Sequence, residues 1–155
     1  MTDSSVRRGM FFEEFEAGYQ ITTAARTVTE ADIVAFAALS GDWNPIHTDA
    51  EYAATTAFGE RVAHGLLGLS IATGLAVRMG FMEDTIIAFR SMEWKFSLPI
   101  KIGDTIHAVV QVAEKQALPR LGGGQITFDV EIINQRGQIT QRGVWVMLVK
   151  SRPAG

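Results

Sequence analysis

The sequence contains no cysteine, which excludes disulfides, thiolate metal sites and a cysteine nucleophile. It also lacks a strong charge of either sign, because 14 lysines and arginines stand against 17 aspartates and glutamates, for a net charge of -3. A nearly neutral chain gives no electrostatic reason to expect nucleic acid or an anionic membrane as a partner. The 155 residues, 47% of them hydrophobic, suit one domain with one sizeable core.

Long hydrophobic runs are scarce as well. The longest, residues 62–81, carries His64 and Arg78, and its charge-free part, about a dozen residues, suits a buried helix better than a membrane span. The first ten residues lack the apolar segment of a signal peptide. We therefore expect a cytoplasmic protein without a membrane partner, with one domain at residues 11–150 between loose tails at residues 1–10 and 151–155.

Residue patterns predict a sheet that is built on a helix. Strand-forming residues favour a strand over residues 19–28, and a helix capped by Thr29 should follow and end at Gly41. Further helices are expected at residues 49–55 and, apolar nearly all round, at residues 64–80. Four antiparallel strands should then occupy residues 85–96, 104–118, 124–134 and 138–149. Together these elements predict an α+β fold whose sheet curls around the apolar helix.

Two chemically useful side chains, Asp42 and His47, lie five residues apart in a segment that Pro45 bends. We expect an ordered loop there, because proline biases Asn44 away from the helical conformation. In such a loop both side chains can face one cleft, where a carboxylate beside an imidazole is a usable proton donor and acceptor. The alternative is structural, with Asp42 capping a turn and His47 packing against its neighbours.

The apolar helix opens with His64 and Gly65. The first amides of a helix lack internal partners and carry the positive end of its dipole. Because Gly65 has no side chain, a substrate carbonyl can approach its N–H closely, as stabilisation of an enolate-like oxygen requires. The alternative is that this glycine only permits close packing. Thr73 carries a hydroxyl further along the helix, where its usual partner is a helical carbonyl. The sequence shows neither a three-ligand metal spacing nor a phosphate-binding loop.

These segments together resemble the MaoC-like, (R)-specific enoyl-CoA hydratases. The resemblance covers residues 11–150 and implies the hotdog fold, in which an antiparallel sheet wraps around a central helix. Four stretches carry it: residues 40–47 (SGDWNPIH), 54–58 (ATTAF), 62–66 (VAHGL) and 95–105 (KFSLPIKIGDT).

The resemblance implies that Asp42 and His47 are the catalytic residues and that the Gly65 amide lies in an oxyanion hole. It implies three supporting residues: Asn44, His64 and Thr73, the last of which stands where relatives often have a serine. The implied reaction is hydration of a 2-enoyl-CoA to an (R)-3-hydroxyacyl-CoA, or the reverse dehydration. The CoA thioester is then the substrate, and no metal or other cofactor is required. Because such hydratases generally pair two sheets side by side, a homodimer or higher homo-oligomer is also implied.

Two other functions stay open at this point. Hotdog folds also host acyl-CoA thioesterases, which direct water at the thioester carbon, and an acyl-thioester binding module would keep the fold without catalysing a reaction. The pattern of Asp42 and His47 favours the hydratase over both, since a binding module needs no acid/base pair.

Overall fold

The computed structural model describes residues 7–155, so the part of the expected N-terminal tail at residues 1–6 lies outside the described residues. The elements are, in chain order, the 3-10 helix η1 (Phe12–Glu14), β1 (Gln20–Thr22), β2 (Arg26–Thr27), α1 (Glu30–Ser40), α2 (Pro45–Thr48), α3 (Ala50–Ala54), α4 (Gly65–Arg78), β3 (Ile86–Phe96), β4 (Thr105–Leu118), the 3-10 helix η2 (Pro119–Leu121), β5 (Gly123–Ile133) and β6 (Ile139–Lys150).

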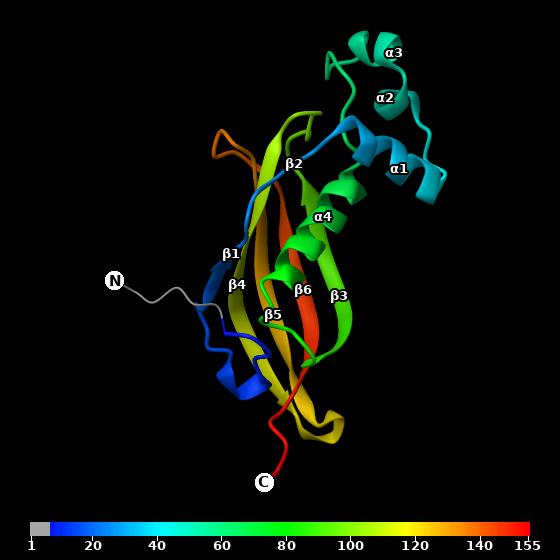
Figure 1. Cartoon of the computed structure of the whole chain (residues 1–155). Helices are drawn as coiled ribbons and strands as arrows, with labels where there is room; N and C mark the ends of the chain where they lie inside the picture. Colours follow the sequence, from blue (N-terminus) through cyan, green and yellow to red (C-terminus); the bar gives the residue numbers. More distant parts are fainter. Residues whose placement is uncertain (1–6) are drawn as a thin grey trace.

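The strands form one antiparallel sheet in the order β1-β4-β5-β6-β3, with β2 paired to the far end of β4. The long helix α4 crosses one face of this sheet (Figure 1). Side chains on the facing side of the strands are buried at every second position, as in β5: Ile126, Phe128, Val130 and Ile132. The predicted α+β architecture, with a curved sheet around an apolar helix, is therefore confirmed.

The single strand expected at residues 19–28 is wrong, because the structure divides it into β1 and β2. The break lies at Thr23, whose hydroxyl accepts the hydrogen bond of the Ala108 amide in place of a backbone carbonyl. The next expectation is confirmed: Thr29 caps α1, and Gly41 ends it in the left-handed conformation with φ at 76°. The residues that cap α1 could be recognised in the sequence. The break between β1 and β2 depends instead on a contact between residues 85 positions apart.

Helix α4 was expected to be enclosed on nearly all sides, and this is wrong for the single chain. Leu67, Leu75 and their neighbours face the sheet, but Leu66 is 59% exposed and Val77 is 63% exposed. These exposed positions recur at helical spacing with Ser70 and Gly74 between them. The sheet therefore covers one face of α4 and leaves a stripe of small and apolar residues open.

The ends of the described chain are packed against the domain. Met10 lies in the core, and its amide donates to the Phe81 carbonyl, so the packed part begins before the expected boundary at residue 11. The Ser151 amide likewise donates to the Gly122 carbonyl, which holds the first residue of the expected C-terminal tail. Among residues 7–155, no helix is both long and apolar enough to cross a membrane. The cytoplasmic location stays a prediction.

Replacing the buried Leu69 by aspartate tests whether α4 is the centre of the fold. We expect Leu69→Asp to lower the unfolding free energy by about 3 kcal/mol or more, because an unpaired charge would enter the core. Leu39→Asp is the matched control, since Leu39 on α1 is 85% exposed. Thermal melting measures both variants. A folded Leu69→Asp protein that melts with the control would mean that α4 is peripheral.

Candidate active site

The three short helices lie beyond one end of the sheet, close to the start of α4 (Figure 1). After Gly41 ends α1, the chain runs through Asp42 to Asn44 and turns into α2 at Pro45. The Asn44 side chain accepts the Ile46 amide and so caps α2. His47 therefore lies in a one-turn helix, which corrects the expected loop. Proline suits the first position of a helix, where its missing N–H costs nothing.

Asp42, His47 and His64 come together at this end of the molecule. One carboxylate oxygen or ring nitrogen of each lies within 4.8 Å of those of the other two. The rings of His47 and His64 are stacked, with centroids 3.9 Å apart and planes inclined by 28°. The sequence predicted the pairing of Asp42 with His47, and His64 joins them because α4 begins beside α2.

Two hydrogen bonds fix the protons on these rings. His47 Nδ1 lies 2.7 Å from the Val62 carbonyl oxygen, and His64 Nε2 lies 2.8 Å from the Asp42 carbonyl oxygen. A carbonyl oxygen only accepts, so both nitrogens carry hydrogen and donate. The ring nitrogen of His47 left for chemistry is therefore Nε2, while His64 Nδ1 is buried without a partner among the described residues.

Burial keeps His47 in its neutral form. Its side chain is 7% exposed, and loss of solvent is the main cause that lowers its pKa from the ordinary value of 6.5. The bond to the Val62 carbonyl opposes this shift, His64 adds to it, and the Asp42 carboxylate opposes it. An imidazole that is neutral near pH 7 offers an Nε2 lone pair to a proton, while Asp42 stays exposed to solvent.

The first turn of α4 supplies free backbone donors next to this cluster. The amides of Leu67 and Gly68 are bonded to the His64 carbonyl, whereas those of Gly65 and Leu66 have no acceptor within residues 7–155. A Cβ atom on Gly65 would lie 2.6 Å from the ring of Phe96. Gly65 therefore does both things considered for it: it permits close packing against Phe96, and its N–H has no acceptor within residues 7–155. Phe96 itself is exposed.

A hollow of about 460 Å³ adjoins these groups. His47 and Gln141 are among its polar lining residues, Gly65 of α4 also lines it, and the remaining walls are mainly apolar. The other lining residues are Ile46, Phe58, Val62, Ala63, Leu66, Phe96, Ser97, Leu98, Pro99 and Ile100. The arrangement of a carboxylate, an imidazole and unbonded amides beside an apolar hollow can hold an extended acyl group and move protons on it.

Sequence reasoning missed Gln141 in this site. Its side chain is 3% exposed on β6, where it donates from Nε2 to the Gly65 carbonyl at 3.1 Å and accepts from Trp94 Nε1 at 2.9 Å. A signal was present: Gln141 has the same strand phase as Gly143 and Trp145, the side that faces the core. A polar residue at an inward position calls for a specific partner.

The structure does not bring Thr73 to this cluster. Thr73 lies eight residues after Gly65, about 12 Å along the helix, and its hydroxyl donates to the Ser70 carbonyl. It lines a different apolar hollow of about 300 Å³, together with Phe89 and Trp145. Within this chain the hydroxyl has the ordinary helical partner that the sequence also suggested.

The cluster of Asp42, His47 and His64 is the one place among the described residues where three side chains that can ligate a metal meet. A chelated metal needs lone pairs that converge on one point. Stacked rings hold theirs in nearly parallel planes, which do not converge on one point. The donor set therefore fits proton transfer better than metal binding.

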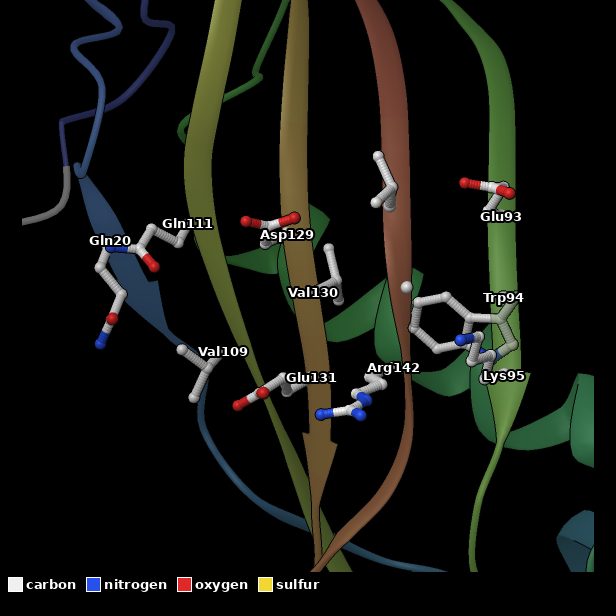
Figure 2. Close-up of a pocket in the computed structure, with 12 residues that line it drawn as sticks. Gln20, Glu93, Trp94, Lys95, Val109, Gln111, Asp129, Val130, Glu131 and Arg142 are labelled. Carbon is white, nitrogen blue, oxygen red and sulfur yellow. The ribbon is translucent and has the colours of Figure 1, made fainter.

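A larger hollow of about 670 Å³ lies on the sheet itself, with α4 behind the strands (Figure 2). Charged side chains of both signs line it: Glu93, Lys95, Asp129, Glu131 and Arg142. It has no histidine and no helix start along its walls, so it lacks the groups for acid/base chemistry that the smaller hollow combines.

Comparison with known proteins places these features in a family. The MaoC-like domain matches residues 14–131. Protein MaoC of Klebsiella aerogenes is 48% identical over 97 residues, which are 62% of this chain but 28% of that longer protein. The (R)-specific enoyl-CoA hydratase of Rhodospirillum rubrum is 39% identical over 103 residues, which cover 66% of this chain and 69% of the relative.

Solved structures agree with this match. A monoamine oxidase regulatory protein from Archaeoglobus fulgius superposes with a TM-score of 0.89 at 38% identity, over 96% of this chain and 99% of that one. A double hotdog protein of Mycobacterium tuberculosis superposes with a TM-score of 0.83 at 16% identity, over 95% of this chain and 46% of that one. The second likeness bears on the fold alone, and it confirms the hotdog assignment.

The environment of His47 predicts its titration. We expect its midpoint, followed by NMR of the ring protons, to lie below 6.5, because burial disfavours the imidazolium. In His64→Phe the midpoint should move up, since the electrostatic interaction with the His64 imidazole, which lowers the His47 pKa, is removed. The unfolding free energy of the wild type should fall as the pH drops below 6.5, because the unfolded chain takes up the proton more readily. A midpoint above 6.5 would contradict the buried, neutral His47.

Proposed function

The chain belongs to the MaoC-like domain family, and on this premise we propose that it hydrates 2-enoyl-CoA thioesters to (R)-3-hydroxyacyl-CoA or catalyses the reverse dehydration. The observation that carries the proposal is the meeting of Asp42 and His47 beside the open amides of α4, at an apolar hollow. Relatives named as (R)-specific enoyl-CoA hydratase and 3-hydroxybutyryl-CoA dehydratase support the same reaction.

In the proposed mechanism the thioester carbonyl accepts hydrogen bonds from the Gly65 and Leu66 amides. These donors stabilise the negative oxygen that forms when the β-carbon is attacked. Asp42 and His47 hold one water over the double bond, within the reach that a separation below 4.8 Å allows. One of them takes a proton from the attacking water, and the other gives a proton to the α-carbon. Both lie on one side of the substrate, so syn addition follows, and the relatives named (R)-specific enoyl-CoA hydratase support an (R) product.

Two further residues, Asn44 and His64, support this pair in the proposal. Asn44 caps α2 and so sets the direction of His47. His64 holds the Asp42 carbonyl and covers one face of the His47 ring. Thr73 lies too far along α4 to assist Asp42 of its own chain, which leaves it a role at the distant hollow. The proposal involves no metal and no cofactor apart from the CoA carried by the substrate.

We also propose that two copies pair through β3. This strand is bonded to β6 on one side only, and nearly all of its residues are exposed. An eleven-residue open edge is an aggregation hazard unless another chain covers it. Leu66 and Val77, at the two ends of the exposed stripe of α4, line hollows together with Phe96 and Phe89 of β3 and would be covered with it.

Removing either member of the pair tests the chemistry. Asp42→Asn and His47→Gln should each lower turnover of an enoyl-CoA by about 10²–10⁴, the range for losing a positioned acid or base. Absorbance of the conjugated thioester follows the reaction, and a free-thiol assay runs beside it. Loss of absorbance with the thioester intact means hydration, released thiol means a thioesterase, and no change means a binding module.

The pH profile of the wild type assigns the two roles. If His47 accepts the proton during hydration, kcat/KM falls on the acid side at the midpoint of His47. If His47 donates it, the loss comes on the alkaline side. Near-normal turnover in a folded Asp42→Asn or His47→Gln variant would rule out the acid/base pair.

Placing a charge on the open stripe tests the pairing of subunits. Val77→Glu should convert a dimer into monomers in sedimentation experiments, because pairing would bury an unpaired carboxylate in the apolar stripe of each copy. Leu39→Glu is the control, since Leu39 lies on the exposed side of α1. A wild-type protein that sediments as a monomer, or a Val77→Glu dimer, would refute this interface.

A further inference from the structure

Gln141 connects the sheet to the first turn of α4. Its Nε2 donates to the Gly65 carbonyl at 3.1 Å, and its Oε1 accepts from Trp94 Nε1 at 2.9 Å. Strand β6 carries the glutamine, β3 carries the tryptophan, and the helix carries the carbonyl. A partly buried chain of two hydrogen bonds therefore joins three elements at the point where the open amides begin.

The direction of the Gln141 amide is determined by its partners. The indole N–H of Trp94 is only a donor, so the oxygen of the glutamine must face it. The backbone carbonyl of Gly65 is only an acceptor, so the NH₂ group must face the helix. Reversing the amide would set donor against donor and acceptor against acceptor. Trp94 therefore keeps the Nε2 of Gln141 on the Gly65 carbonyl.

The helix is shaped to receive this side chain. A Cβ atom at Gly68 would lie 2.6 Å from Gln141 Nε2 and 2.7 Å from Ile100 Cδ1. The missing side chain at Gly68 is thus the space that the glutamine fills. Gly68 is one turn of the helix away from the Gly65–Leu66 peptide unit, so the packing contact and the hydrogen bond hold the same turn.

We propose that Gln141 is a positioning residue that orients the oxyanion hole, with Trp94 as the residue that orients Gln141. The inference rests on the proposed function. The Gly65 carbonyl and the Leu66 N–H belong to one rigid peptide plane. Holding the carbonyl from the sheet side therefore sets the direction of the N–H. Donors that are aimed before the substrate arrives need no reorganisation in the transition state.

Variants at both positions test the chain of bonds. Gln141→Met keeps the length of the side chain and removes both bonds, and Trp94→Phe removes only the bond that orients the glutamine. We expect kcat to fall about 10-fold in Gln141→Met and less in Trp94→Phe, with KM within about twofold, because misaimed donors weaken transition-state binding. Gln116→Met is the matched control on an exposed part of β4, and its kcat should not change.

Folding is separated from positioning in two ways. The double variant Trp94→Phe/Gln141→Met leaves no indole donor without a partner, so it stays testable if the single Gln141→Met unfolds. The infrared stretch of the thioester carbonyl in bound butyryl-CoA, a saturated and unreactive ligand, reports the hydrogen bonds on that oxygen. Its shift to lower frequency on binding should shrink in the folded Gln141 variants and stay unchanged in Gln116→Met.

The outcomes separate this inference from the proposed function. A folded variant without Gln141 that keeps the wild-type kcat and carbonyl stretch overturns the positioning role while hydration by the wild type stands. A wild type that hydrates no enoyl-CoA overturns the proposed function, and the infrared comparison still decides whether Gln141 aims the amides at a bound thioester.

Discussion

The hydrogen bond from His64 Nε2 to the Asp42 carbonyl is the contact on which the arrangement of the site depends. It ties the segment that follows α1 to the residue that begins α4. Without it, the carboxylate would lie on a short connection beyond the sheet, far along the chain from the open helical amides. Because the same ring is stacked on His47, one side chain fixes the distance between the acid/base pair and the helix start.

The position of His64 also affects the pKa of His47. His64 lowers the pKa of the neighbouring His47, and loss of solvent acts on His47 in the same direction. A neutral His47 needs only one acceptor for its N–H, which the Val62 carbonyl provides, while the Asp42 carbonyl accepts from His64 Nε2. Backbone oxygens thus select the tautomers, and His47 Nε2 is the ring nitrogen that remains available for proton transfer in the proposed reaction.

Features set by neighbouring residues could be predicted from the sequence, while those set by distant contacts could not. Capping by Thr29 and the end of α1 at Gly41 follow from chemistry within one turn, and the strands after α4 follow from their alternation and turns. The broken first strand was missed because Ala108 causes it. The one-turn helix at His47 was missed because proline permits a helix start as readily as a loop. The resemblance to a family supplied Asp42, His47 and Gly65, but the partners of Gln141 come from three separate elements.

The short helices and the strand ends contribute different parts of the candidate site. Asp42 and His47 are held by local turns and by the helix start, whereas much of the hollow is lined by Leu98 and its neighbours, which follow β3. Shape and reactivity therefore lie on separate stretches of chain. Under the proposed function, substitutions after β3 can enlarge or narrow the hollow without disturbing proton transfer. The same separation offers protein engineers a way to change the accepted acyl group while the chemistry is kept.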